Sequence, residues 1–234
     1  MKETGEIGTT KRVISVIRHA TKDGDTGELN DQGKREAGEY WSSEGQGIGG
    51  DLIVCHSPIN RTKETGELIA RTYPGKLEVI RLMENLTEFP YTDEAIGMWG
   101  LTGGKWLEND KYREGLPSTK EVAGRMASVI LDLLEEVARN DDKLFVLVSH
   151  VPPIMLFIRW YWEERFVGMD GEQILKEMGG FTKVLHGFGI ETDRSDKAQV
   201  KLIFEKWNGN NFENIELPLS IPRLKEMSRW EVTR

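Results

Sequence analysis

The segment VISVIRHATKDG, residues 13–24, contains an apolar run that stops abruptly at Arg18 and His19 and is followed at once by a polar loop. Three later segments have the same apolar character: DLIVC at 51–55, LEVI at 77–80 and LFVLVS at 144–149. Segments with helical periodicity separate these runs, and such an alternation of strands and helices is typical of an α/β sheet. We therefore predict an α/β protein with three layers, α/β/α, around a mostly parallel mixed sheet.

Four segments between or after these strands carry residues that commonly begin a helix. They are Asn30 or Asp31 in GELNDQG, Ser57 followed by Pro58, Ser118 with Glu121 as a capping box, and Pro152 with Pro153. In the second of these, Ser57 is expected to be the N-cap and Pro58 the first helical residue, because proline lacks the N–H that has no partner there. This start places Arg61 in the first turn of its helix.

We expect one domain over residues 1–234, because a chain of this length can bury a substantial core. Residues 184–207 are predicted to form a C-terminal hairpin, since two strand-like segments flank the polar DRSDK. Residues 85–117 lack sustained periodicity and are expected to be an insertion over one edge of the sheet. Its aromatic and basic side chains either cap a substrate or pack locally: Trp99, Lys105, Trp106, Tyr112 and Arg113.

Composition excludes several classes of protein. The formal net charge of -8 does not suit a general nucleic-acid or anionic-membrane surface, so any anion site must be a local concentration of positive charge. No apolar segment reaches the roughly 20 residues that span a bilayer. The single Cys55 and the polar start of the chain, which lacks the apolar core of a secretory signal, favour a reducing, cytoplasmic setting. The oligomeric state stays open.

Basic and imidazole side chains follow three of the predicted strands. The first strand ends in Arg18 and His19, the second leads to Ser57 and Arg61, and the fourth ends in His150. Ligands of open α/β sheets bind beyond the carboxyl ends of the strands, so these side chains can converge on one pocket. Two arginines and two histidines beside a helix N-terminus favour an anion, and phosphate suits such a site.

These motifs resemble those of the histidine phosphatase superfamily. VIRHA matches the usual R-H-G or R-H-A start, HSPINRTKET matches S-P-x-x-R-x-x-x-T, and VLVSHVPPI matches the late S-H element of that family. The resemblance covers roughly residues 12–160, with the three motifs in the expected order and on the expected elements. The chain departs from the family in RHATKDGDTGELN, which has no clear equivalent of an asparagine and a second arginine found in glycolytic mutases, and in Val151-Pro152 after His150.

The resemblance implies a two-step phosphoryl transfer. His19 would attack the substrate phosphorus and become a phosphohistidine, which water then hydrolyses. Arg18, Arg61 and His150 would hold the phosphoryl oxygens and stabilise the charge that develops. The nearby arginines would also favour the neutral, nucleophilic form of His19, because like charges disfavour protonation. The scheme requires no metal ion and no cofactor.

The resemblance also implies a proton donor after the third strand. Leu82-Met83-Glu84 matches the family's L-x-E pattern, so Glu84 is expected to be the general acid, with Glu88 and Asp93 as reserves. Ser57 and Thr21 are further candidates for phosphate contact, although helix capping explains Ser57 equally well.

Two other functions stay open. A phosphoglycerate-mutase-like phosphotransferase would need a bisphosphorylated primer, whereas a non-catalytic phosphate-binding or scaffold protein would bind phosphate without turnover. The expected partner is a phosphorylated small molecule or a phosphoprotein, which the core motifs do not distinguish. We assign His56 and His186 to structure or surface, because no pair of histidines has metal-ligand spacing.

Overall fold

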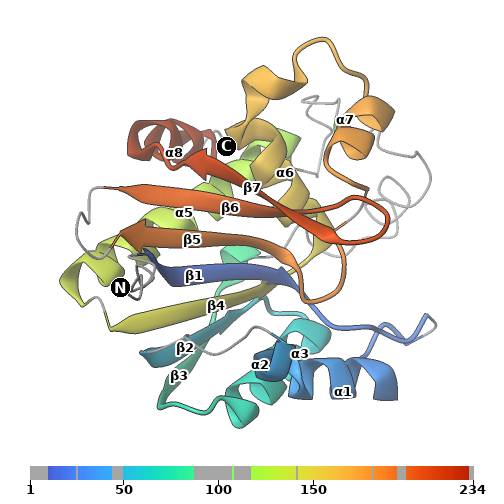
Figure 1. The fold of residues 1–234 in the computed structure, drawn as a ribbon, viewed down its shortest axis with the longest axis vertical. Helices are drawn as coiled ribbons and strands as arrows, with labels where there is room; N and C mark the ends of the chain where they lie inside the picture. Colours follow the sequence, from blue (N-terminus) through green and yellow to red (C-terminus); the bar gives the residue numbers. More distant parts are fainter. Residues whose placement is uncertain are drawn as a thin grey trace, which may run out of the picture.

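A seven-stranded sheet forms the centre of the protein (Figure 1). The computed structural model describes residues 10–24, 26–43, 50–86, 107, 117–140, 142–180, 182–193 and 199–231. The strands are β1 (Thr10–Arg18), β2 (Asp51–His56), β3 (Leu77–Leu82), β4 (Lys143–Ser149), β5 (Gly187–Asp193), β6 (Val200–Trp207) and β7 (Phe212–Pro218). Their order is β3-β2-β4-β1-β5-β6-β7.

The sheet is mixed, as predicted. The strands β3, β2, β4 and β1 are parallel to one another. β1 pairs antiparallel with β5, and β6 and β7 continue the sheet in antiparallel pairs. The four strands predicted from apolar runs are therefore β1 to β4, and β5 pairs with β6 within the expected hairpin range of 184–207. The antiparallel part is larger than expected, because β7 adds a strand that the sequence analysis did not identify.

Helices cover both faces of the sheet, which confirms the predicted layers. On one face lie α1 (Asp31–Gly38), α2 (Tyr40–Ser43) and α3 (Asn60–Thr72); on the other lie α5 (Thr119–Arg139), α6 (Val151–Tyr161) and α8 (Ile221–Ser228). Successive side chains of β4 alternate between the two cores: Phe145 and Leu147 pack on the α5 side, and Val146 and Val148 on the α3 side. The remaining elements are α7 (Gly171–Glu177), η1 (Glu84–Leu86), η3 (Glu163–Phe166) and η4 (Arg229–Glu231).

Residues next to one another in the sequence explain three of the helix starts. The side chain of Asn30 accepts a hydrogen bond at the N-terminus of α1, and Ser118 and Glu121 form a reciprocal capping box at α5. Two prolines follow the first residue of α6. These starts agree with the sequence-based predictions, because each depends on residues that are neighbours along the chain.

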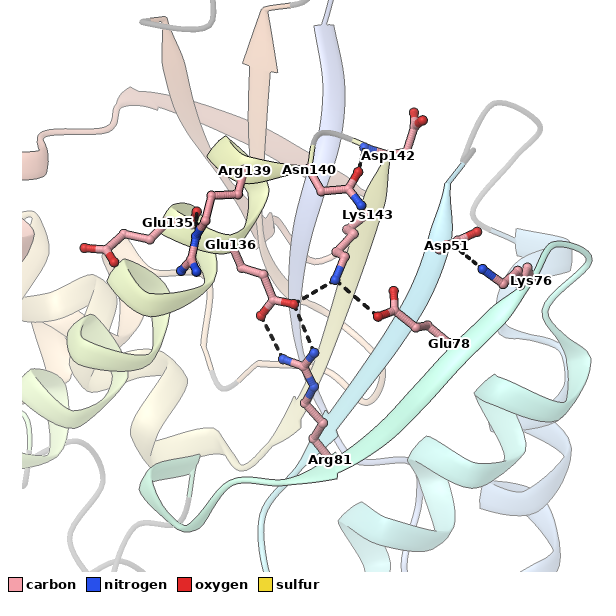
Figure 2. A network of polar contacts seen from close by, with 10 residues as sticks. All are labelled: Asp51, Lys76, Glu78, Arg81, Glu135, Glu136, Arg139, Asn140, Asp142 and Lys143. Atoms are coloured by element: carbon pink, nitrogen blue, oxygen red, sulfur yellow. Dashed lines mark hydrogen bonds and ion pairs between the residues drawn. The ribbon is translucent and has the colours of Figure 1, made fainter.

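An ion-pair network fixes the C-terminal part of α5 against the sheet (Figure 2). Both guanidinium nitrogens of Arg81 on β3 donate to the carboxylate of Glu136, at 2.8 and 3.0 Å. Lys143 at the start of β4 reaches Glu136 at 2.9 Å and Glu78 at 3.2 Å. The bond from Arg81 is the main reason that the pKa of Glu136 falls to about 2. The network therefore orients α5 across β3 and β4.

Most of the predicted insertion lies outside the described residues, since only 85, 86, 107 and 117 of the range 85–117 are described. Its role as a cap stays a prediction, as does the extent of the single domain. No helix in the described part of the chain is both long and apolar enough to span a membrane.

Candidate active site

The carboxyl ends of three neighbouring strands bring four of the predicted side chains together. His19 follows β1, Ser57 follows β2 and His150 follows β4. Because β4 lies between β2 and β1, His150 lies between the other two. Arg61 joins them as the second residue of α3. All four residues are buried.

The contacts of His19 determine which ring nitrogen carries the proton. Its Nδ1 lies 2.7 Å from the carbonyl oxygen of Ala20, which can only accept a hydrogen bond, so Nδ1 is protonated. Nε of Arg61 donates to Nε2 at 3.0 Å, and a guanidinium can only donate, so Nε2 presents its lone pair. Two separate contacts therefore give the same tautomer, in which Nε2 carries the lone pair and accepts the bond from Arg61.

Arg61 also orients the second histidine. Its Nη2 donates to Nδ1 of His150 at 3.2 Å, which leaves the ring proton of a neutral His150 on Nε2. That Nε2 lies 2.9 Å from the hydroxyl oxygen of Ser57, which accepts the bond. The rings of His19 and His150 meet edge to face with centroids 5.4 Å apart. One guanidinium thus bridges both imidazoles.

Ser57 continues this chain of hydrogen bonds instead of capping α3. Its Oγ lies 2.8 Å from Oγ1 of Thr62, whose own hydroxyl donates to the carbonyl of Ile59 at 2.7 Å. The proposed N-cap was wrong: α3 begins at Asn60 with Ile59 as its N-cap and no side-chain cap bond. The hydroxyl bonds to His150 and Thr62 and also accepts from the backbone N–H of Ile59 at 3.4 Å. The helix starts two residues later than predicted.

Burial and positive charge keep both rings neutral. Burial lowers the pKa of His19 to about 3; the charges of Arg61, Arg18 and Lys22 act in the same direction, and the bond to Ala20 opposes them. Burial, followed by the charge of Arg61, also lowers the pKa of His150 well below its usual value. Neutrality at physiological pH is a requirement for a nucleophilic imidazole.

Arg18 stands beside this group and is anchored from a distant segment. Its Nη1 donates to the carbonyl oxygen of Thr182 at 2.9 Å. Burial lowers the pKa of Arg18, whereas the carboxylate of Glu36 raises it. The positive charge of Arg18 also lowers the pKa of both His19 and His150.

The other predicted contacts stand apart from the histidine pair. Glu84 is exposed at the start of η1, which follows β3 at the same edge of the sheet. Glu88 and Asp93 lie outside the described residues. The backbone N–H of Thr21 donates to Glu36 at 3.0 Å. The roles of Glu84 and Thr21 in catalysis and phosphate binding therefore stay predictions.

The remaining histidines and the cysteine have contacts that suit structural roles. Nδ1 of His56 lies 2.7 Å from the carbonyl of Ser57, and Nδ1 of His186 lies 2.9 Å from a carboxylate oxygen of Glu205. Burial raises the pKa of Cys55 to about 12, so its thiol is not activated at neutral pH.

Sequence reasoning missed three threonines around the site. Thr62 ends the hydrogen-bond chain from His150, and Thr65 links the first two motifs, since its Oγ1 accepts from the N–H of Ala20 at 3.2 Å and donates to Arg61 at 2.7 Å. Thr65 was part of the matched motif, which is a signal that could have identified it. Thr182 had no such signal.

Comparisons with known proteins identify the family and the fold. The family model described as the histidine phosphatase superfamily (branch 1) matches residues 14–176. The solved structure of mycobacterial hydrolase 1 is 18% identical, with a TM-score of 0.58 over 86% of this chain and 99% of that chain. The native structure of a mycobacterial glucosyl-3-phosphoglycerate phosphatase is 19% identical, with a TM-score of 0.58 over 85% of this chain and 99% of that chain. At these identities the likeness shows a common fold. No curated protein sequence matches the chain.

Proposed function

Because the chain belongs to the histidine phosphatase superfamily (branch 1), we propose that it hydrolyses phosphomonoesters through a phosphohistidine formed on His19. The observation that carries this proposal is the tautomer of His19. Its protonated Nδ1 is anchored on Ala20 and its Nε2 lone pair lies 3.0 Å from the cationic Arg61. A neutral nucleophile beside fixed positive charge suits attack on an anionic phosphoryl group.

In the first step, Nε2 of His19 attacks phosphorus, a P–N bond forms and the ester P–O bond breaks. The leaving oxygen takes a proton from the carboxylic acid of Glu84, the residue that the family pattern favours. The imidazole ring becomes positively charged, and the carbonyl of Ala20 stabilises it by accepting from Nδ1–H. Nε–H of Arg61 donates to the Nε2 lone pair before substrate binds, so in this scheme that hydrogen bond moves from Nε2 to a phosphoryl oxygen as the P–N bond forms.

In the second step, water attacks the phosphorus. Its proton passes to the carboxylate of Glu84, the P–N bond breaks, and the electron pair returns to Nε2 of His19. Orthophosphate leaves and the enzyme regains its starting protonation. A water molecule takes the place of the alcohol, so the same residues serve both steps in reverse roles.

Arg18, Arg61 and His150 stabilise the charge of the transferring group in this scheme. The two guanidinium groups supply positive charge that a metal ion supplies in other phosphotransfer enzymes, and we therefore propose metal-independent hydrolysis. His150 is neutral while Arg61 donates to its Nδ1. A phosphoryl dianion beside the ring favours its protonated form, which can then donate from Nδ1.

Hydrolysis of an activated aryl phosphate and of an alkyl phosphate, both measured with a chelator present, tests the proposal. We expect wild-type turnover of both substrates and none with His19→Ala. Glu84→Gln should slow the alkyl ester roughly 100-fold or more and the aryl ester far less, because a phenolate scarcely needs a proton. Glu135→Gln, which changes an exposed carboxylate on α5, serves as the control.

Other outcomes identify the alternatives. Equal losses on both esters would remove Glu84 from the acid role and direct the same test to Glu88 and Asp93. Transfer of phosphate to an alcohol, dependent on a bisphosphorylated primer, would identify a mutase. Phosphate binding by a folded protein without any turnover would contradict the enzymatic proposal and support a binding protein.

A further inference from the structure

The segment 182–186, between α7 and β5, holds Arg18 from three directions. The backbone N–H of Arg18 donates to His186 at 3.0 Å, its carbonyl accepts from Leu185 at 3.0 Å, and its Nη1 donates to Thr182 at 2.9 Å. Every atom that segment 182–186 contributes to these bonds belongs to its backbone. The segment therefore fixes both the main chain and the side chain of Arg18 without using the hydroxyl of Thr182.

The backbone of this segment has an unusual conformation. Leu185 has a φ of 59°, in the left-handed region that a branched side chain rarely adopts. This conformation is unfavourable for leucine. In it, the Leu185 N–H and the His186 carbonyl both bond to the backbone of Arg18. The turn is thus held in a defined shape against the end of β1.

Two buried polar atoms in this contact have no hydrogen-bond partner among the described residues. They are Nε of Arg18 and Oγ1 of Thr182, and Thr182 is 8% exposed. Leaving such a buried group without a partner is unfavourable, because it loses its bonds to water and gains none in return. A ligand that accepts hydrogen bonds from both atoms would recover this loss. Arg18 and Thr182, already joined through Nη1, therefore offer two unused donors to a ligand.

The chemistry of the two atoms selects the class of ligand. Nη1 of Arg18 is already used by the Thr182 carbonyl, and the opposite edge of a guanidinium, formed by Nε and Nη2, is the edge that can bind an oxyanion through two bonds. A threonine hydroxyl can donate to the same anion. Arg18 directly precedes the proposed nucleophile His19 in the chain, and its charge lowers the pKa of both histidines of the site.

We infer that Thr182 is a phosphoryl-binding residue whose hydroxyl donates to the same phosphoryl oxygens as Nε of Arg18. The inference rests on the proposed function, since it assumes a phosphorylated ligand at His19. It extends the site to a segment far from the three motifs, because Thr182 is separated from Arg18 by 164 positions.

Thr182→Val tests this role, because valine keeps the branched shape and removes only the hydroxyl. Thr182→Ser keeps the hydroxyl. Thr192→Val removes a threonine hydroxyl at the far end of β5, the strand that follows this segment, where β5 pairs with Lys11. The probe is orthophosphate, titrated calorimetrically at constant ionic strength. The unfolding free energy of each variant is measured in urea.

We expect Thr182→Val to weaken orthophosphate binding about 10- to 100-fold, the range for a lost hydrogen bond to a charged group. Thr182→Ser and Thr192→Val should stay within about threefold of wild type. The stability of Thr182→Val should not fall, because the hydroxyl has no hydrogen-bond partner to lose among the described residues. A purely structural threonine would show the opposite pattern, with lower stability and unchanged affinity.

The titration separates this inference from the proposed function. If wild type binds orthophosphate without hydrolysing esters, the proposed function fails while the affinity of Thr182→Val still decides the inference. Wild-type affinity in Thr182→Val would overturn the role of Thr182. No binding of orthophosphate by wild type at millimolar concentration would overturn both.

Discussion

Replacement of His19 should change how the stability of the protein responds to acid. The pKa of His19 falls from 6.5 to about 3 on folding, mainly because the ring is buried. Between these two values the unfolded chain binds a proton at this site that the folded protein does not, so stability falls as pH falls. The loss begins near the unfolded pKa, continues to about pH 3, and is absent above about pH 7.

The size of this effect follows from the shift. Each pH unit between the two pKa values costs about 1.4 kcal/mol, and the loss from pH 7 to pH 5 integrates to about 2 kcal/mol, because protonation of the unfolded chain is incomplete near pH 6.5. His19→Asn removes the titrating ring. Its unfolding free energy should therefore fall by about 2 kcal/mol less than that of wild type over this interval.

Urea unfolding at pH 7 and pH 5 measures this difference directly. His150→Asn should flatten the response in the same direction, because the pKa of His150 is also lowered by burial. Equal losses in wild type and His19→Asn would refute the reasoning. Such a result would mean that folding does not lower the pKa of His19.

Three further changes test other parts of the structure. Ser57→Ala removes the acceptor for Nε2 of His150. It should lower kcat/KM about tenfold and cost about 1 kcal/mol of stability in urea unfolding. Unchanged kinetics would contradict the hydrogen-bond chain. Gly33→Ala places a Cβ 2.0 Å from the backbone oxygen of Thr21 and should destabilise the protein by about 1–3 kcal/mol. Gly38→Ala in the same helix meets no atom within 4 Å and should be neutral or stabilising. Equal effects of the two variants on the melting temperature would contradict this packing. Glu136→Gln should lower the free energy of unfolding by about 1 kcal/mol at neutral pH. Wild type should lose this extra stability as pH falls from about 4.5 to about 2. Identical acid unfolding curves for the two proteins would show that the network adds no stability.

Much of the fold could be predicted because its signals are local. The apolar runs ending at Ser149 and His56 identify parallel strands, and the capping box of Ser118 lies within four consecutive residues. The strand β7 was missed because it lies at the edge of the sheet and most of its side chains are exposed, so it has no apolar run. The other edge strand, β3, was identified because it keeps the apolar run LEVI.

The residues of the site could be predicted from the sequence, but the hydrogen bonds between them could not. Matched motifs indicated His19, Arg61 and His150, and the parallel strands bring them together. The hydrogen bond of Ser57 to His150 spans 93 positions, so local rules favoured the capping role instead. Thr182 reaches Arg18 only because β5 lies beside β1 in the folded sheet. Such contacts depend on tertiary structure, which local propensity does not encode.

Chemical trapping of the phosphorylated protein tests the central claim most directly. Wild type and His19→Ala are mixed with a phosphate-labelled aryl ester, quenched rapidly in denaturant, and assayed for label on the protein that is acid-labile and base-stable. We expect such label on wild type within the first turnover, and mass spectrometry should locate it at His19. His19→Ala should carry no label. Turnover by wild type with no protein-bound phosphate, or label that persists in His19→Ala, would contradict the central claim.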